Sequence, residues 1–256
     1  FEATYRSLYV RYKDEHSSDS RKRRMPAWFN RLQIIDSTTI SLFSNLIFKG
    51  VGRHPKTGKK KGGIKVHTNI HANEFVPSDI KFTSAATNDS FMLKPANYND
   101  GDIIAMDRAY IDYARFGELT NRGVTYVTKM KKNLVYDTLS DTMYMLPCGL
   151  MECRVQVVEF RKHIKGGENI KHKARIVTYV DPAKKKAKVI SLLTNDMTME
   201  VEDIIDIYRQ RWEIELLFKQ LKQNFPLKYF YGESANAIKI QIWVTLIANL
   251  LLMVIK

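Results

Sequence analysis

Four side chains with the chemistry to hold a phosphodiester are spaced along residues 208–222. Tyr208, Arg211, Glu215 and Lys222 are separated by three, four and seven positions. At about 100° per residue, a helix would place all four within roughly 60° of one another, along about 21 Å. One carboxylate among two cations and a phenol suits a divalent metal ion beside a chain of phosphates. The stretch therefore predicts a helix that handles nucleic acid.

A solvated helix with ordinary ion pairs is the alternative, because charged side chains often recur at spacings of three and four. The flanking sequence favours the first interpretation. Apolar side chains surround the polar line at Ile204, Ile205, Ile207, Trp212, Ile214, Leu216, Leu217, Phe218 and Leu221. A polar line on a mostly buried helix indicates a lined groove.

Two aspartates add to this carboxylate. Asp36 ends the apolar run 31–36 and Asp107 ends the run 102–107, so each is expected at the end of a buried strand. If the two strands are neighbours, both aspartates emerge at one edge of a sheet, where a packed helix could bring Glu215. Three clustered carboxylates need cations, and oxygen ligands favour Mg²⁺. Two such ions about 3.5–4 Å apart would suit an in-line phosphoryl displacement.

Other acids fit this site less well. Glu213 lies about 200° around the helix from Glu215 and leaves the polar line. Glu202 lies near the start of the same helix, outside the spacing. Asp102 begins the strand that Asp107 ends, about 17 Å away, and cannot share its site. The three acids named first remain the predicted set.

The remaining pattern predicts an α/β fold with a mixed central sheet flanked by helices. Strands are expected at 31–36, 64–71, 75–83, 102–107 and 124–129, and helices at 88–98, 113–121, 201–224 and from 235. Short β-prone runs at 143–146, 153–160, 174–180 and 189–193 predict an antiparallel unit before the helix that carries Glu215. We therefore divide the chain into the end of an upstream domain with a connector (1–30), a catalytic core (31–133 and 200–256) and a β-rich insertion (134–199).

Composition points to a folded protein with a polyanionic partner. Of the 256 residues, 45% are hydrophobic, and the net charge is +14. Seven Lys or Arg and no acid lie between Lys49 and Lys65. Such patches attract double-stranded DNA, although a solvated lysine-rich surface is the alternative. Contacts to the DNA backbone are expected from Arg53, Lys59, Lys60 and Lys61.

Cysteine and histidine indicate no zinc site. Cys148 and Cys153 have no second pair, and two thiols suggest neither a disulfide framework nor an oxidising compartment, so a cytoplasmic protein is expected. His67 and His71 would lie about 13 Å apart on a strand, which favours a structural role.

The apolar run 238–255 is long enough to suggest a membrane span. Gln241, Thr245 and Asn249 recur every four residues within it, however, and this polar stripe favours a buried helix without a membrane partner. The chain starts at Phe1, and its last helix is still running at Lys256, so we expect a piece of a longer protein.

The spacing Y-x2-R-x3-E-x6-K resembles that of the DDE transposases of bacterial insertion sequences, specifically the insertion-sequence-4 type. This chain matches all four positions. Asp36-Ser-Thr-Thr resembles the first catalytic motif of that family, and Asp107-Arg-Ala-Tyr resembles the second. The β-rich segment 134–199 resembles the family's insertion, and Leu193-Thr-Asn195 is typical of the segment before the helix. The resemblance covers roughly residues 30–256.

The resemblance implies a ribonuclease-H-like fold, two Mg²⁺ ions (with Mn²⁺ as a substitute) and cut-and-paste movement of DNA. It makes Asp36, Asp107 and Glu215 the catalytic metal ligands. The remaining three signature residues, Tyr208, Arg211 and Lys222, would bind phosphates near the transposon end, often beside a flipped base. A homodimer on DNA and a location in the bacterial cytoplasm, at the nucleoid when bound, are further implications.

Two departures from the family pattern are visible. Some relatives stack a Trp of the insertion on the flipped base, whereas this chain has Trp only at 28, 212 and 243. Tyr136, Tyr144 and Phe160 are candidate substitutes. The upstream DNA-recognition region is also absent from this sequence. The alternatives are a ribonuclease-H-like nuclease without strand transfer and an inactive DNA-binding relic.

Overall fold

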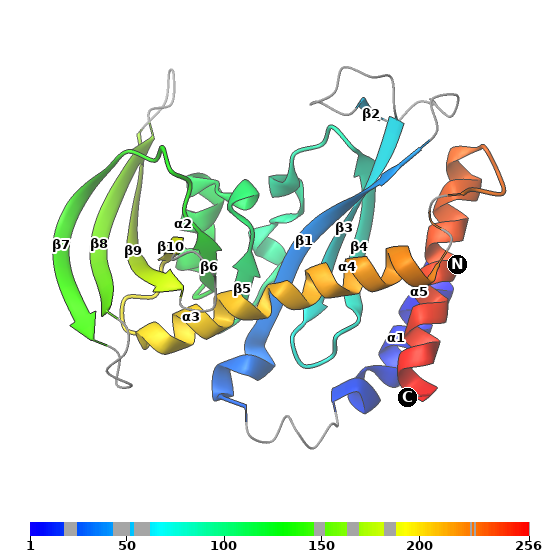
Figure 1. Ribbon diagram of the computed structural model, residues 1–256, viewed down its shortest axis with the longest axis horizontal. Coiled ribbons are helices and arrows are strands. Elements are labelled where there is room, and N and C mark those ends of the chain that lie inside the picture. Colours follow the sequence, from blue (N-terminus) through cyan, green and yellow to red (C-terminus); the bar gives the residue numbers. More distant parts are fainter. Residues whose placement is uncertain are drawn as a thin grey trace. The chain divides into compact units, whose positions relative to one another are not determined.

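A computed structural model describes residues 1–17, 25–42, 52–53, 62–145, 152–162, 169–181, 188–225, 227 and 229–255 (Figure 1). The chain forms two compact units. The first comprises Phe1–Asn30, Ile34–Met92 and Trp212–Lys256, and the second comprises Arg31–Gln33 and Leu93–Arg211. Both combine strands with helices, and the sheet contains parallel and antiparallel pairs, so the predicted mixed α/β class is confirmed.

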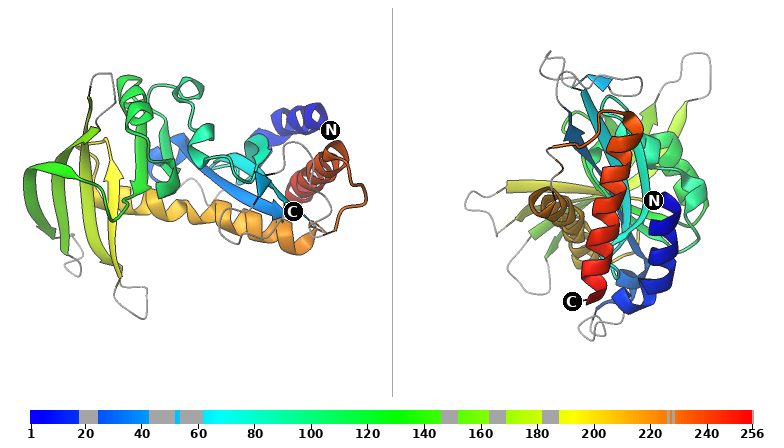
Figure 2. Two further views of the ribbon diagram at one scale, coloured as in Figure 1. Left: turned by 90° about the horizontal axis from the view of Figure 1, so that it is seen from above. Right: turned by 90° about the vertical axis from the view of Figure 1, so that its right-hand side faces the viewer.

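The first unit is a small sheet covered by long helices. Its elements are α1 (Glu2–Ser17), the 3₁₀ turn η2 (Ala27–Arg31), β1 (Leu32–Ser41, in this unit from Ile34), β2 (Gly52–Arg53), β3 (Gly62–His71), β4 (Pro77–Ser84), the 3₁₀ turn η3 (Asp89–Met92), α4 (Trp212–Asn224) and α5 (Ala235–Ile255). The strand order is β2-β3-β1, and β4 also pairs with β3. Helices α1 and α5 lie side by side (Figure 2).

Helix α5 is a core helix of this unit. In the described residues it is the one helix long and apolar enough to cross a membrane, a test that core helices also pass. The predicted polar stripe faces inward, because Thr245 and Asn249 are buried. Trp243 packs its ring 5.5 Å from Tyr5 of α1 and 5.4 Å from Phe82 of β4. These contacts fit burial against protein.

The second unit is a larger sheet that ends in the predicted antiparallel segment. Its elements are the 3₁₀ turn η4 (Pro95–Asn97), β5 (Ile103–Met106), the 3₁₀ turn η5 (Arg108–Tyr110), α2 (Tyr113–Asn121), β6 (Thr125–Lys129), β7 (Tyr136–Met145), β8 (Glu152–Lys162), β9 (Ile170–Asp181), β10 (Lys188–Thr194) and α3 (Val201–Gln210). The strand order is β5-β6-β10-β9-β8-β7, with β5 parallel to β6 and every later pair antiparallel. Helix α2 packs against β6 and β9, and α3 packs against β5, β6 and β10.

A buried aromatic cluster fixes α2 to this sheet. Phe116 stacks on Tyr126 with ring centroids 3.9 Å apart, and Tyr113 stacks on Phe160 at 4.9 Å. The Tyr126 hydroxyl is 2.6 Å from Nε2 of the buried His172. Burial lowers the pKa of His172 to about 4, so the ring is neutral near pH 7.

Two expected elements differ from the structure. The helix predicted at 88–98 is replaced by η3 and η4, because Pro95 has no N–H to donate and its ring disfavours helical backbone at Lys94, which is extended (φ −105°, ψ 105°). Strand β1 does not end at Asp36 but continues to Ser41. Its extension, Thr38-Thr39-Ile40, consists of β-branched residues that favour a strand.

Other predictions agree. Helix α2 spans Tyr113–Asn121 as expected and is followed by Gly123 with φ 70°. A Cβ at Gly123 would lie 1.9 Å from Asp100 Oδ1, so the turn requires glycine. The predicted helix 201–224 is present as α3 and α4, separated by Arg211, which keeps a right-handed helical backbone. His67 and His71 lie on β3 as expected.

Candidate active site

Asp36 lies in the middle of β1 with a half-buried side chain. Its Oδ1 accepts a hydrogen bond from the backbone N–H of Ser37 at 2.8 Å. Because side chains alternate along a strand, Asp36 and Thr38 point to one face of the sheet and Ser37 points to the other. The carboxylate is thus presented on the same face as Thr38.

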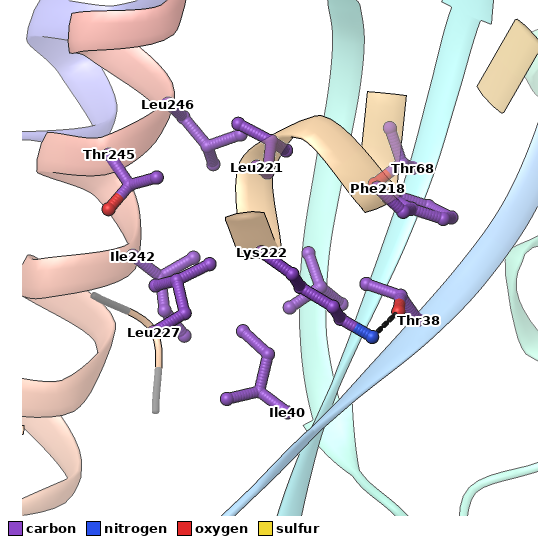
Figure 3. Close-up of a pocket in the computed structure, with 11 residues that line it drawn as sticks. Thr38, Ile40, Thr68, Phe218, Leu221, Lys222, Leu227, Ile242, Thr245 and Leu246 are labelled. Atoms are coloured by element: carbon purple, nitrogen blue, oxygen red, sulfur yellow. Dashed lines mark hydrogen bonds between the residues drawn. The ribbon is translucent and has the colours of Figure 1, made fainter. Parts of the chain in front are cut away.

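Helix α4 lies across that face of the first unit. The Lys222 ammonium donates to Thr38 Oγ1 at 2.5 Å (Figure 3). It also donates to the Thr39 carbonyl at 3.3 Å. Phe218 and Leu221 of α4 line a small apolar pocket together with β1, β3 and α5. The apolar side of α4 therefore seats the helix, and its lysine reaches β1 two residues beyond Asp36.

Lys222 is an exposed residue, but its ammonium group is partly shielded from water. The residue as a whole is exposed, but burial around the ammonium group lowers its pKa. Its hydrogen bonds to Thr38 and Thr39 orient the charged group toward β1. Such a point charge is suited to holding a phosphate oxygen near this strand.

Glu215 occupies the first turn of the same helix and is half-buried. It precedes Lys222 by seven residues, or about 10.5 Å along the helix axis. Asp36 precedes Thr38 by two residues, or about 6.8 Å along the strand. In Figure 1, β1 and α4 run in broadly the same direction where they cross. The first unit thus carries two of the three predicted acids, on elements that the Lys222–Thr38 hydrogen bond joins.

Asp107 belongs to the second unit, directly after β5 as predicted. It is half-buried, and its Oδ1 accepts a hydrogen bond from Ala109 N–H at 2.9 Å, which caps η5. The cap fixes the carboxylate at the carboxyl end of the strand. Its place beside Asp36 and Glu215 stays a prediction.

Tyr208 and Arg211 lie together at the end of α3, also in the second unit. The Arg211 N–H donates to the Tyr208 carbonyl at 3.2 Å, and its guanidinium carbon lies 5.5 Å from the Tyr208 ring centroid. Both side chains are half-buried. A guanidinium presents a planar fork of donors that can bind two oxygens of one phosphate.

Asn195 anchors the segment that leads into α3. Its side-chain amide donates to Thr120 Oγ1 at 3.0 Å and to the Val124 carbonyl at 2.8 Å, and its Oδ1 accepts from Tyr126 N–H at 2.9 Å. The chain after β10 is therefore fastened to the turn between α2 and β6. This gives the Leu193-Thr-Asn195 motif a structural role.

The divalent metal site remains a prediction. Within the described ranges, no group of three or more His, Cys, Asp or Glu side chains is close enough to hold a metal ion. The donor chemistry nevertheless fits a hard cation, since Asp36 and Glu215 are half-buried carboxylates on contacting elements and Asp36 is oriented by a backbone N–H.

Several predicted DNA contacts fall outside what the structure describes. Lys59, Lys60 and Lys61 are among the residues without description, and so is Cys148. Arg53 lies on β2, but only its backbone is described. These contacts stay predictions.

Burial removes one of the three aromatic residues that were candidates to replace a base-stacking Trp. Phe160 is completely buried and packs on Tyr113, so the idea that it stacks on a DNA base is wrong. Tyr136 is half-buried with its ring 5.5 Å from Phe160, and Tyr144 is half-buried on β7. The presence of an aromatic residue in a predicted strand does not tell whether its side chain is buried or exposed.

One site residue was missed from the sequence. Thr38 receives the Lys222 hydrogen bond, although it was noted only as part of the Asp36-Ser-Thr-Thr run. Alternation along β1 could have placed it on the Asp36 face, but nothing in the sequence pairs it with a lysine 184 residues away.

The first unit carries one carboxylate on β1 and a second on a helix that contacts this strand, and carboxylates of this kind are the ligands that metal-dependent nucleic-acid enzymes use. A family model described as "Transposase DDE domain" matches residues 27–251. The chain belongs to this family of transposase domains.

Individual relatives agree with the family. The chain is 26% identical over 221 residues to "Putative transposase y4zB" of Sinorhizobium fredii, covering 86% of this chain and 60% of that protein. It is 28% identical over 219 residues to "Putative transposase for insertion sequence element IS4SA" of Synechocystis, covering 85% and 58%. The chain thus spans somewhat more than half the length of these relatives.

The fold has a counterpart among solved structures. A piggyBac transposase, solved as a synaptic complex with hairpin DNA, matches with a TM-score of 0.52 and 12% identity, over 88% of this chain and 46% of that one. At this identity the likeness concerns the fold alone, and it confirms the predicted ribonuclease-H-like architecture.

Proposed function

We propose that this chain is the catalytic region of an insertion-sequence transposase that cleaves transposon ends and joins them to target DNA. The observation that carries the proposal is the Lys222–Thr38 hydrogen bond, because it brings the helix of Glu215 across the strand of Asp36. Family membership supplies the reaction class. The insertion-sequence-4 type, with its Tyr/Arg/Glu/Lys spacing, is part of the proposal.

The proposed metal ligands are Asp36, Asp107 and Glu215, with Asp107 taken from the motif resemblance. Bound Mg²⁺, or Mn²⁺ in its place, would supply charge stabilisation for an in-line phosphoryl displacement. In this scheme Asp36 and Glu215 contribute oxygen donors from β1 and α4. Ser37 N–H holds the Asp36 carboxylate in a fixed orientation.

Phosphate binding is assigned to the cations of the Tyr/Arg/Glu/Lys spacing. Arg211, stacked on Tyr208, offers a planar fork of donors, and Lys222 offers a point charge over β1. The net charge of +14 adds long-range attraction for double-stranded DNA, which Arg53 and the lysines at 59–61 would extend along the backbone. A homodimer on DNA and a bacterial cytoplasmic, nucleoid-associated location complete the proposal.

A strand-transfer assay tests the function. Purified protein, extended by its native flanking sequence where one exists, is incubated with Mn²⁺, a labelled duplex bearing the transposon end and a supercoiled target plasmid. Joined product that requires a 3′-hydroxyl on the end would support transposition. Nicking without joining would favour the nuclease alternative, and DNA binding without either reaction would favour the inactive relic. Light scattering of the DNA complex would show whether it contains two protein chains.

A further inference from the structure

A hydrogen-bonded network lies on the face of β1 opposite to Asp36. Ser37 Oγ donates to Asp89 Oδ1 at 2.5 Å, and the Lys65 ammonium donates to the same oxygen at 3.1 Å. Lys65 also donates to the Thr87 carbonyl at 2.6 Å. All of these residues belong to the first unit. Asp89 is therefore held by a lysine on β3 while it holds a serine on β1.

Ser37 connects this network to the candidate metal ligand. Its hydroxyl bonds Asp89, while its backbone N–H bonds Asp36 Oδ1 at 2.8 Å. The rotation of the Ser37 peptide group sets the direction of that N–H. A side chain that fixes Ser37 therefore also fixes the carboxylate that Ser37 orients, as outer partners do for metal ligands in general.

The charges of the network suit a supporting role. Asp89 would add a third negative charge near Asp36 and Glu215 if it stood alone. The Lys65 side chain is 12% exposed and that of Asp89 is 24% exposed, so the ion pair is largely shielded from water. Lys65 thus compensates Asp89 where an unpaired carboxylate would repel the carboxylate of Asp36.

We propose that Asp89 is a positioning residue, which acts through Ser37 to hold Asp36 in the orientation that binds a divalent metal ion. The inference rests on the proposed function, because it takes Asp36 as a metal ligand. Asp89 itself lies on the other face of β1 and is not a ligand in this scheme. Nothing in the motif spacing around Asp36, Asp107 or Glu215 points to it.

The chain offers a closely matched control. Asp79 on β4 pairs with Lys81 at 3.2 Å and with Arg6 of α1 at 3.6 Å, and its side chain is 26% exposed, against 24% for Asp89. Both aspartates belong to the first unit and both pair with a lysine. Only Asp89 also accepts a hydrogen bond from Ser37. Asp79→Ala therefore reports the cost of losing a surface-near ion pair without the link to Asp36.

The experiment measures Mn²⁺ binding to the complete chain by isothermal titration, without DNA and without reference to cleavage. Substitution of a residue that bonds directly to a metal ligand typically weakens metal binding by about 10–100-fold. Asp89 acts on Asp36 only through Ser37, so Asp89→Ala should weaken Mn²⁺ binding by about tenfold, at the lower end of that range. Ser37→Ala should match it. Ser37→Thr, which keeps the hydroxyl, and Asp79→Ala should stay within about twofold of the unmodified chain. Urea midpoints without metal show that each variant is folded.

The outcomes separate this inference from the function on which it rests. If the unmodified chain binds Mn²⁺ and Asp36→Asn does not, the ligand assignment stands. Equal affinity of Asp89→Ala and Asp79→Ala would then overturn the role of Asp89 alone. Normal binding by Ser37→Ala beside weak binding by Asp89→Ala would overturn the route through Ser37. If the unmodified chain binds no Mn²⁺, the proposed metal site and this inference fail together.

Discussion

Lys222 of α4 donates a hydrogen bond to Thr38 of β1, two residues beyond Asp36. This contact joins positions 184 residues apart and places the helix of Glu215 over the strand of Asp36. The helix is held there by its apolar side, where Phe218 and Leu221 face the pocket between β1, β3 and α5. Lys222 of this helix thus reaches β1, and Glu215 lies on the same helix, which makes Glu215 the most direct test of catalysis.

Glu215→Gln should lower Mg²⁺-dependent cleavage by roughly 10³-fold, or about 4 kcal/mol of transition-state stabilisation, since an amide is a poor ligand for a hard cation. DNA affinity should stay nearly unchanged, because no Lys or Arg side chain is removed. Cleavage is measured on a labelled transposon end and binding by fluorescence anisotropy.

Glu213→Gln is the matched control for this change. Burial raises the pKa of Glu213, and the residue points about 200° away from Glu215 on the same helix, so the amide there should leave the site unchanged. Equal loss of binding and cleavage in Glu215→Gln, or equal loss of cleavage in both variants, would contradict the catalytic assignment.

Arg211→Ala should weaken binding to terminal DNA and reduce the slope of log K against log salt by about one, as expected for one lost phosphate contact. The physical reason is the guanidinium of Arg211, whose carbon lies 5.5 Å from the Tyr208 ring centroid and whose forked donors suit a phosphate. Affinity is measured by anisotropy between roughly 50 and 200 mM salt.

Arg209 supplies the comparison, because it lies two residues earlier on α3 and pairs with Asp206 on the exposed surface at 2.9 Å. Arg209→Ala should leave the slope nearly as it was. A slope that does not change in Arg211→Ala would remove the phosphate contact from the proposal.

The sequence predicted correctly those helices and turns that depend on local patterns. It failed to predict the end of a strand where contacts with distant residues determine the structure. Helix α2 and its Gly123 stop follow from periodicity and from the need for positive φ, and both are confirmed. Asp36 was placed at a strand end because an acid commonly closes an apolar run, yet β1 continues through Thr38 to Ser41. The part of β1 beyond Asp36 pairs within the sheet and accepts the hydrogen bond from Lys222, and the apolar segment 31–36 shows neither of these contacts.

In the candidate site, too, local patterns were predictable from the sequence and long-range contacts were not. Types and spacing identified the polar line, because helical geometry alone relates its members. The Asp89–Ser37 bond spans 52 residues and depends on how η3 folds back over β3, in a region where a helix was expected. Phe160 looked available as an aromatic residue, but only packing against Tyr113 showed that it is core.

Acid should destabilise the protein between about pH 6.5 and pH 4. Burial lowers the pKa of His67 and of His172 to about 4, from an ordinary value of 6.5. In this window the unfolded chain binds a proton that the folded chain does not, so stability rises with pH and is lost as pH falls. Each ring contributes up to about 3 kcal/mol. Urea unfolding at several pH values measures the effect.

A double variant isolates the contribution of His172. Tyr126→Phe with His172→Phe removes the titrating ring and its hydroxyl partner together, and should flatten the pH dependence by about half. Tyr126→Phe alone removes the hydrogen bond but keeps the ring, and should retain the full slope. An unchanged slope in the double variant would show that His172 does not titrate with unfolding.

Asn195→Ala should destabilise the second unit by about 2–3 kcal/mol, because the change removes three hydrogen bonds and leaves Tyr126 N–H and the Val124 carbonyl without this partner. Asn121→Ala provides the control, since Asn121 is exposed at the end of α2 and should change stability by less than about 0.5 kcal/mol. Chemical unfolding gives both values. If the two variants were equally stable, Asn195 would not fasten the chain after β10 to the α2–β6 turn, and the start of α3 would be set by its packing on β5, β6 and β10 instead.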